Sequence, residues 1–284
     1  MATQAAREAG RVILRRYREG AIAVEPKLDN SPVTVADREA NAVILATLTP
    51  AFPDDAILSE ESPDSRARLG KARVWIVDPL DGTRDFVART GDFCVHVGLA
   101  VEGIATVGVV HHPLSGAMFT AVRNEGAFLD VDGTRTRLAT STIAPRESIS
   151  LGVSRLNISA NLLAALVAVG LDQQTVAMGA SVKLMAVARG ALEAVVTFSA
   201  AEMEWDTCAP EVIVREAGGK FTDLDGRAFR YNQLELSHQR GSVASNGACH
   251  AVLLELLRPQ FRPDGTSVGA GMTDATSVVG KGAS

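Results

Sequence analysis

The sequence has few of the residues that hold small secreted domains together. It contains 3 cysteines in 284 residues, and Cys94, Cys208 and Cys249 lie far apart. Because no C-x-x-C pair occurs, the sequence predicts neither a disulfide framework nor a thiolate zinc site. Aromatic residues make up 5% of the chain, which argues against a protein that binds single-stranded nucleic acid by base stacking.

Positive charge is also limited. The chain has 28 Lys and Arg residues against 33 Asp and Glu residues, which gives a formal net charge of −5. A protein that binds a nucleic acid polymer needs a broad basic surface, so this balance excludes such a partner. It does not exclude a small anionic substrate, because a bound metal ion can supply the positive charge.

Long apolar runs are missing as well. The longest run, Leu162–Leu171, is interrupted by Gly170 and is far shorter than the ~18 residues of a membrane span. Charged residues stand at positions 7, 8, 11, 15 and 16, where a signal peptide has its apolar core. We therefore expect no integral membrane segment and a cytoplasmic location.

The remaining composition is that of a globular chain, with 46% hydrophobic and 21% charged residues. At about 150 residues per domain, the length corresponds to about two compact units. The first part predicts helices over 2–19 and 33–46, strands at 56–58 and 74–77, and hairpins over 94–122. Strands and helices then alternate, which is typical of a layered α/β unit. The strands are expected at 149–153, 174–178 and 192–198, and the helices at 162–170, 183–189 and 206–217.

We expect these elements to form two halves followed by a tail. An N-terminal α+β half covers residues 1–138, and a C-terminal α/β half covers residues 139–258. Thr34 is expected to cap the second helix, and residues 50–55 to end it. Small and polar residues without periodicity dominate the end of the chain, so residues 259–284 are predicted to be a disordered tail.

Acidic residues stand at the ends of apolar segments rather than on polar helix faces. They are Glu60, Glu61, Asp78, Asp81 and Asp206. An ionised carboxylate beside a buried strand end is costly unless it is paired or binds a cation, and few basic residues are adjacent. A hard cation such as magnesium, held by oxygen ligands, accounts for the pattern. Ordinary Asp-Pro and Asp-Gly turns, with an acid in the first turn of a helix, account for it as well.

The spacing favours the metal site. Asp78 and Asp81 flank a predicted turn, so their side chains and the Leu80 carbonyl can converge on one point. Gly82 and Thr83 follow directly and offer backbone N–H groups to an anion such as a phosphate.

Three motifs in this order resemble the inositol monophosphatase superfamily. They are Glu60-Glu61-Ser62, the run from Asp78 to Thr83 (Asp-Pro-Leu-Asp-Gly-Thr), and Trp205-Asp206 followed by Glu216-Ala217-Gly218-Gly219. The resemblance covers most of the chain. It implies a metal-dependent, lithium-sensitive phosphatase with a five-layer αβαβα sugar-phosphatase fold, of the α/β (α+β) class.

The resemblance also implies a role for each acidic residue. Two to three magnesium ions would be bound, with paired ions about 4 Å apart. Asp37 would hydrogen-bond Thr83, and this pair would orient and deprotonate the attacking water. The amides of Gly82 and Thr83 would bind the phosphate. The implied metal ligands are Glu60, Asp78 and the Leu80 carbonyl for one ion, Asp78, Asp81 and Asp206 for the second, and Glu60 with Glu61, the latter through water, for a third. Glu61 is counted with Asp37 and Thr83 among the implied catalytic residues.

The substrate depends on a second stretch of sequence. Gly179, Ser181 and Lys183 lie between a predicted strand and a predicted helix, a position suited to an anion. Lys183 would meet a second phosphate, or else be a solvated lysine. The stretch resembles the 3′(2′),5′-bisphosphate nucleotidase branch, the CysQ type. That branch converts adenosine 3′,5′-bisphosphate, a by-product of sulfate assimilation, to AMP and phosphate.

One departure from this branch keeps other readings open. Leu156-Asn157 stands where the branch has Ser-His, so contacts to the sugar or base differ. Tyr231 is expected either to stack on adenine or to pack in the core. The alternatives are an inositol-1-monophosphatase or another sugar phosphatase, such as a fructose-1,6-bisphosphatase. A metal-binding regulatory protein without catalysis is the alternative outside enzymes, and the sequence leaves a homodimer open.

Overall fold

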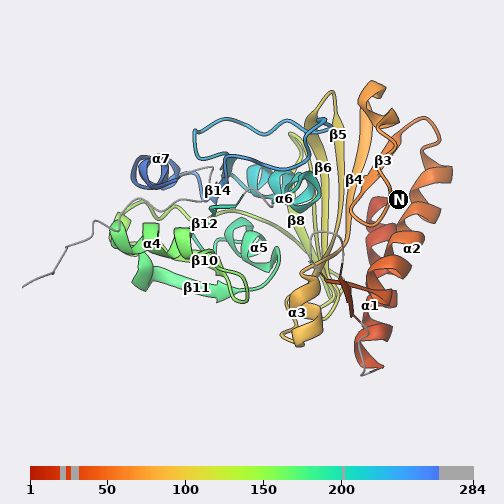
Figure 1. Cartoon of the computed structure of the whole chain (residues 1–284), viewed down its shortest axis with the longest axis horizontal. Helices are drawn as coiled ribbons and strands as arrows, with labels where there is room; N and C mark the ends of the chain where they lie inside the picture. The colour runs from red at the N-terminus through yellow and green to blue at the C-terminus, as the bar shows by residue number, and fades with distance from the viewer. Residues whose placement is uncertain (20–23, 27–31, 200–201, 262–284) are drawn as a thin grey trace, which may run out of the picture.

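The helices and sheets of the protein are stacked in five layers, as the computed structural model shows (Figure 1). The structure describes residues 1–19, 24–26, 32–199 and 202–261. From one side to the other, the layers are a helix pair, a seven-stranded sheet, a second helix pair, a five-stranded sheet and a third helix pair. This order confirms the predicted αβαβα fold.

The large sheet has the strand order β3-β4-β5-β6-β7-β8-β9. Only β3 and β4 run parallel; the other neighbours are antiparallel, as the predicted hairpins require. Its strands are β3 (Ala56–Ser59), β4 (Arg73–Asp81), β5 (Cys94–Val101), β6 (Ile104–His112), β7 (Ala117–Val122), β8 (Gly126–Val131) and β9 (Thr134–Arg137).

The small sheet has the order β11-β10-β12-β14-β13, and β10 runs parallel to both of its neighbours. A separate pair, β1 (Val24–Pro26) and β2 (Pro32–Thr34), precedes the second helix. The strands of the small sheet are β10 (Leu151–Ser154), β11 (Thr175–Met178), β12 (Ala194–Thr197), β13 (Lys220–Thr222) and β14 (Ser242–Ser245).

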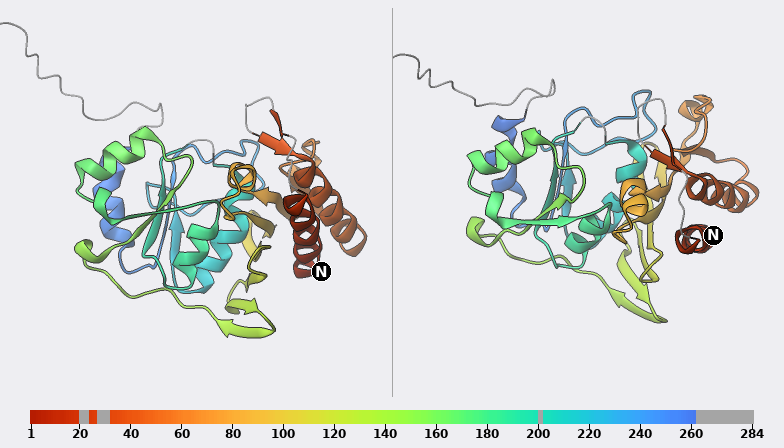
Figure 2. Two further views of the ribbon diagram at one scale, coloured as in Figure 1. Left: turned by 90° about the horizontal axis from the view of Figure 1, so that it is seen from below. Right: turned by 60° about the horizontal axis from the view of Figure 1, so that its bottom comes forward.

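Helices cover both faces of each sheet. Views from two further directions place α1 and α2 outside the large sheet and α4 and α7 outside the small one, with α5 and α6 between the sheets (Figure 2). A short helix α3 follows β4. The helices are α1 (Ala2–Arg18), α2 (Val35–Ala51), α3 (Thr83–Ala88), α4 (Ala160–Ala168), α5 (Val182–Ala188), α6 (Glu204–Glu216) and α7 (His250–Leu257), with 3₁₀ turns at Ala67–Gly70, Arg146–Ser148, Asp172–Gln174 and Arg258–Gln260.

Two boundaries differ from the prediction. The second helix continues through Pro50 to Ala51, because a proline in the last turn removes only one helical hydrogen bond. The predicted turn that starts at Asp78 is still part of β4, which ends at Asp81. Its pairing with β5 shifts register between Asp78 and Asp81, and the chain turns only at Gly82, whose φ is +88°. A β-bulge between Asp78 and Asp81 therefore takes the place of the turn that the sequence predicted there.

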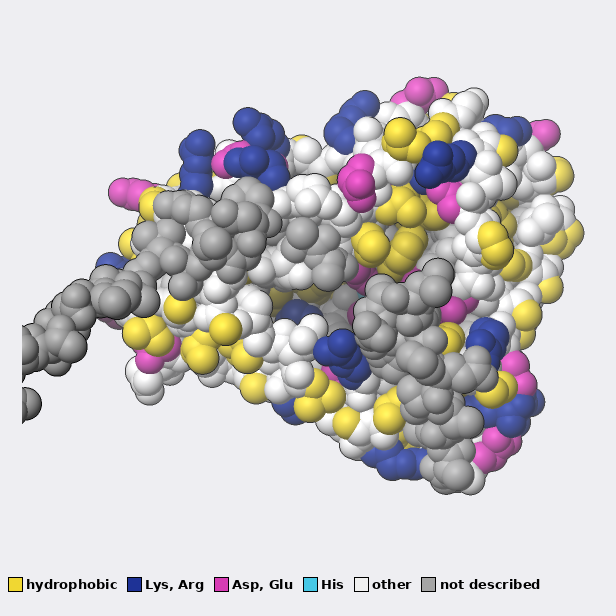
Figure 3. Space-filling view, viewed as in Figure 1, with side chains coloured by type: hydrophobic (Ala, Val, Ile, Leu, Met, Phe, Trp, Pro, Cys, Tyr) yellow, Lys and Arg dark blue, Asp and Glu magenta, His cyan; other side chains and the backbone are white. Residues whose placement is uncertain are grey.

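Other predictions concern the surface and the end of the chain. Among the described residues, no helix is both long and apolar enough to cross a bilayer. On one face, Lys and Arg side chains are scattered among acidic ones (Figure 3). The predicted tail lies outside the described residues from position 262, while residues 258–260 form a 3₁₀ turn.

Two glycines of the large sheet allow helix α6 of the middle layer to pack closely against the strands. Gly98 of β5 and Gly108 of β6 lie directly opposite each other, and α6 packs over both. A Cβ on Gly98 would lie 2.7 Å from Cys208 Sγ, and one on Gly108 would lie 2.3 Å from the Ala209 carbonyl oxygen. Larger side chains would therefore push α6, and Asp206 in its first turn, away from the sheet.

We expect Gly108→Ala to lower the free energy of unfolding by about 2 kcal/mol or more, because the new methyl group collides with the α6 backbone. Urea titration measures the change. Gly70→Ala is the matched control, since a Cβ there has nothing within 4 Å. Equal stability of the two variants would contradict this account of how α6 is placed.

Candidate active site

Three carboxylates from two layers meet at the end of β4. Asp78 and Asp81 flank the bulge of β4, and Asp206 stands in the first turn of α6. One oxygen atom from each lies within 4.8 Å of one from each of the others. The structure therefore brings together three acidic residues that are up to 128 positions apart in the sequence.

Each of these carboxylates is held by a backbone N–H group at one oxygen. Such bonds fix the rotation of a carboxylate and leave its second oxygen to face a ligand. Leu80 N donates to Asp78 Oδ1 at 2.9 Å, Ser181 N donates to Asp81 Oδ2 at 2.6 Å, and Met203 N donates to Asp206 Oδ2 at 2.7 Å.

Burial and like charge act against ionisation of this cluster. Burial raises the pKa of Asp78 well above its usual value, and the charges of Glu60, Asp81 and Asp206 raise it further. Burial and the charges of Asp81 and Glu60 likewise raise the pKa of Asp206. Burial also raises the pKa of Asp81, but the charge and contact of His96 outweigh it and bring the pKa down to about 2.

The residues present fit a hard divalent cation. All the converging side-chain atoms are carboxylate oxygens, which are the preferred ligands of such ions. A cation among them would remove the mutual repulsion that raises the pKa values of Asp78 and Asp206. The cluster therefore has the chemistry of a metal site.

The predicted pair Asp37 and Thr83 is also brought together. Thr83 Oγ1, at the start of α3, donates to Asp37 Oδ1 at 3.0 Å and lies 3.2 Å from the Leu80 carbonyl oxygen. Asp37 Oδ2 accepts hydrogen bonds from the amide and the hydroxyl of Thr34 at 2.7 and 2.6 Å. Burial raises the pKa of Asp37 although these hydrogen bonds oppose the shift.

The loop with Glu60 and Glu61 borders the same cluster. The amide of Glu60 donates to the Val77 carbonyl of β4, and Glu60 lines the cleft beside Asp81 and Asp206. The carbonyl of Glu61 accepts a hydrogen bond from Asn41 Nδ2 at 3.3 Å. The metal role of Glu60, and the catalytic and metal roles of Glu61, remain predictions.

A cleft of about 440 Å³ opens over these residues. Its lining contains both charged and apolar side chains. The charged residues are Glu60, Asp81, Arg84, Lys183, Glu202 and Asp206. The apolar residues, called the apolar wall below, are Leu156, Ile158, Leu162, Val196 and Phe198.

Most of the predicted substrate residues line this cleft, and one does not. Gly82, Thr83, Ser181 and Lys183 are on its surface. Gly179 lies outside the lining, and its amide donates to Asp92 Oδ2 at 2.8 Å. A Cβ on Gly179 would lie 2.4 Å from the Asp85 carboxylate, so this glycine allows a close approach between α3 and the segment before α5.

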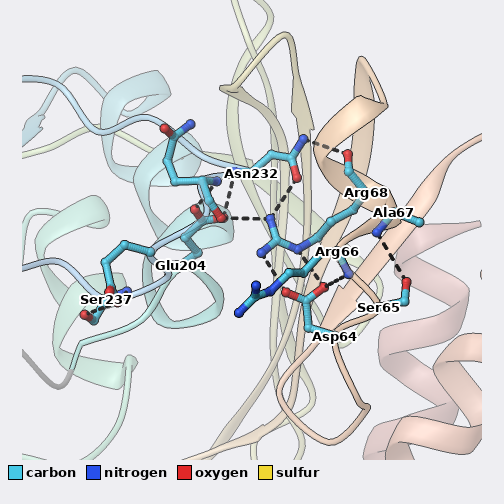
Figure 4. Close-up of polar contacts among 10 residues, drawn as sticks. Asp64, Ser65, Arg66, Ala67, Arg68, Glu204, Asn232 and Ser237 are labelled. Carbon is cyan, nitrogen blue, oxygen red and sulfur yellow. Dashed lines mark hydrogen bonds and ion pairs between the residues drawn. The ribbon is translucent and has the colours of Figure 1, made fainter.

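The loop after Glu61 is tied to α6 by residues that the sequence did not indicate (Figure 4). Arg68 is buried and donates twice to Asp64, at 3.0 and 2.8 Å. Its Nη1 donates to Asn232 Oδ1 at 2.9 Å and to the Gln233 carbonyl at 3.0 Å. The amides of Asn232 and Gln233 in turn donate to Glu204, two residues before Asp206. Burial raises the pKa of Glu204 to about 7.

The local sequence did not predict where three further residues lie relative to the site. His96 is fully buried beside Asp81, and Glu202 lines the cleft. No periodicity or motif marks either of them, because their neighbours are distant in sequence. Tyr231 is a core residue whose hydroxyl donates to Glu211 at 2.5 Å, so the adenine-stacking alternative is wrong.

Comparison with known proteins gives consistent matches. A sequence profile of the Inositol monophosphatase family matches residues 1–261. The 3′(2′),5′-bisphosphate nucleotidase CysQ of Escherichia coli O157:H7 is 35% identical over 235 residues, which cover 82% of this chain and 93% of that protein. The Histidinol-phosphatase of Mycobacterium tuberculosis H37Rv is 36% identical over 253 residues, 86% of this chain and 92% of that protein.

Solved structures agree with these sequence matches. The extragenic suppressor protein SuhB of Bartonella henselae superimposes with a TM-score of 0.75 at 30% identity, over 90% of this chain and 96% of that chain. CysQ of Bacteroides thetaiotaomicron, a bacterial member of the inositol monophosphatase family, superimposes with a TM-score of 0.71 at 29% identity, over 87% and 96% of the two chains.

We expect Asp78→Asn to stabilise the metal-free protein at about pH 8. The pKa of Asp78 in the folded protein is raised above that in the unfolded chain. The stability that this group contributes is therefore fully present below the unfolded pKa and lost as pH rises through the folded pKa. Asparagine avoids burying the charge.

Thermal unfolding in a chelator, at roughly pH 5 and pH 8, measures this difference. The advantage of the variant should grow toward the higher pH. Addition of a divalent cation should stabilise the wild type more than the variant, which lacks one anionic ligand. A variant that is less stable than the wild type at the higher pH without metal would contradict the repulsion.

Proposed function

The chain belongs to the inositol monophosphatase family of phosphatases, and we propose that it is a magnesium-dependent nucleotidase that hydrolyses adenosine 3′,5′-bisphosphate to AMP and phosphate. The observation that carries this proposal is the mixed lining of the cleft. It combines an acidic cluster and Lys183 with the apolar wall.

The apolar wall favours a substrate with a flat, poorly hydrated group. Leu156, Ile158 and Phe198 lie on this wall, and Leu156 is 44% exposed. An adenine ring would cover such a surface and remove it from water. A polyol such as inositol would place hydroxyl groups against it without hydrogen-bond partners. Leu156, where the sequence departs from the bisphosphate nucleotidase pattern, thus contributes to the same wall.

The basic side chains of the lining favour a substrate with a second phosphate. Lys183 lines the cleft, and its Nζ donates to the Ala180 carbonyl at 2.5 Å in this structure. A phosphate there would gain a charge-assisted hydrogen bond if the lysine side chain turned toward it. Arg84 adds a second cation to the lining.

The residues of the chain supply positioning and proton transfer. The Thr83 hydroxyl donates a hydrogen bond to Asp37 Oδ1. The lone pairs of Thr83 Oγ1 can therefore accept a hydrogen bond from the attacking water and orient it. The amides of Gly82 and Thr83 face the phosphate, whose negative charge they stabilise. Magnesium ions bound by Glu60, Asp78, Asp81, Asp206 and the Leu80 carbonyl would supply an acidified water and charge stabilisation of the leaving oxygen.

A second candidate is hydrolysis of histidinol phosphate. The match to the Histidinol-phosphatase of M. tuberculosis is as close as that to CysQ. Glu202 lines the cleft, and its buried Oε2 accepts no hydrogen bond from the described residues. Such a carboxylate suits an ammonium group of the kind that histidinol phosphate carries. The intact Asp37–Thr83 bond favours either enzyme over a metal-binding regulatory protein without catalysis.

Lys183→Ala should lower kcat/KM for adenosine 3′,5′-bisphosphate by about 10- to 100-fold, because a charge-assisted hydrogen bond to the second phosphate is lost. Inositol 1-phosphate and histidinol phosphate, which have one phosphate, should lose much less. Phosphate release on the three substrates measures the effect, and Lys71→Ala is the control on an exposed lysine. Equal losses on all three would remove the second-phosphate role.

Thr83→Ala should lower kcat by about 100-fold or more with a smaller change in KM, because the hydroxyl that orients the water is removed. Thr83→Ser keeps the hydroxyl and should recover most of the activity. The assay is phosphate release with magnesium, with and without lithium, and we expect lithium to inhibit the wild type. Full activity of the alanine variant would exclude the proposed water-orienting role.

A further inference from the structure

A buried histidine lies between the two parts of the metal site. His96 is on β5 with no exposed surface, and in the sheet it pairs with Asp78 of β4. Nδ1 of its ring is 3.2 Å from the Trp205 carbonyl oxygen, and Nε2 is 3.2 Å from Asp81 Oδ2. Both ring nitrogens therefore lie beside acceptor oxygens, although Nε2 makes no hydrogen bond of good geometry with the described residues.

We propose that His96 is a positioning residue that fixes the Asp81 carboxylate and the start of α6 relative to each other, so that both can bind the same cation. This inference rests on the metal-dependent activity proposed above. It assigns a role to a residue that does not contact the substrate and was not identified by any motif.

The contact to Asp81 determines which carboxylate oxygen is available. Oδ2 accepts the Ser181 amide at 2.6 Å and also faces His96 Nε2. No hydrogen bond from the described residues reaches Oδ1. Rotation of the carboxylate would break the Ser181 bond and bring the second oxygen against the ring. Oδ1 is thus the atom left for a cation, and His96 keeps it there.

The contact to Trp205 determines where the next ligand lies. Trp205 directly precedes Asp206, so a bond to its carbonyl fixes the first turn of α6 at the level of β4. The same ring therefore joins a ligand of the large sheet to a ligand of the middle layer. The lowered pKa of Asp81, to about 2, agrees with a close contact between its carboxylate and His96.

Two substitutions separate the two contacts. In His96→Gln the amide nitrogen can take the place of Nε2 and donate to Asp81, whereas in His96→Asn it can take the place of Nδ1 and donate to Trp205. His96→Leu removes both ring nitrogens. The control is His111→Gln, a substitution of another buried histidine of the large sheet, whose ring contacts the Ala117 carbonyl at 3.0 Å and lies next to Gly10 of α1.

The main readout is the affinity of the metal-free protein for Mn²⁺, measured by titration calorimetry. Loss of an outer partner of a metal ligand typically costs about 10- to 100-fold in affinity, and we expect this loss for His96→Leu. His96→Gln should stay within about threefold of the wild type, His96→Asn should fall between, and His111→Gln should be unchanged. Thermal unfolding shows which variants fold; if His96→Leu does not, the glutamine and asparagine variants decide.

Two results would overturn the inference. One is wild-type Mn²⁺ affinity in His96→Leu, or in both polar variants if His96→Leu does not fold. The other is a glutamine variant that binds as weakly as the leucine variant. A wild type that binds Mn²⁺ but hydrolyses none of the three esters refutes the proposed nucleotidase and leaves the affinity comparison valid. A wild type that binds no Mn²⁺ refutes both.

Discussion

Repulsion between buried carboxylates is the constraint on which the rest of the structure depends. Asp78 is buried, Asp81 and Asp206 are half-buried, and all three place oxygen atoms within 4.8 Å of one another, where water screens their charges less than at the surface. The chain offsets part of this cost locally, through a backbone N–H on each carboxylate and through His96 beside Asp81. The remainder is the free energy that a divalent cation would recover on binding. The site is thus a poor arrangement for a protein alone and a favourable one for a protein with metal.

No single element could build this cluster. The bulge of β4 brings Asp78 and Asp81 to one point, but the third acid has to come from another layer. Gly98 and Gly108 let α6 approach the large sheet closely enough for Asp206 to reach that point. The position of a metal ligand therefore depends on the absence of two side chains on neighbouring strands, and this links core packing to the chemistry.

Local patterns in the sequence predicted the parts of the site that are local in the fold. A β-branched run indicated β4, although the strand ends at Asp81 rather than before Asp78, and Thr34 indicated the start of α2. The five layers followed from the family resemblance rather than from periodicity. Arg68 and Asn232 are 164 positions apart in the sequence, and no local pattern in either segment predicts their contact. Gly179 illustrates the same limit, because its motif suggested an anion site whereas its neighbours give it a packing role.

The division of the cleft between layers explains how one phosphatase site can serve different esters. The acids and amides proposed to act on the phosphate belong mainly to β4, α3 and α6, whereas the apolar wall comes from β12, from its C-terminal end, and from the segment between β10 and the first turn of α4. Substitutions in the wall can change the leaving group that fits without moving a metal ligand. Relatives named as a bisphosphate nucleotidase and as a histidinol-phosphatase can therefore match this chain equally well, at 35% and 36% identity. Under the proposed function, substrate choice depends on the residues of the wall together with Lys183 and Glu202.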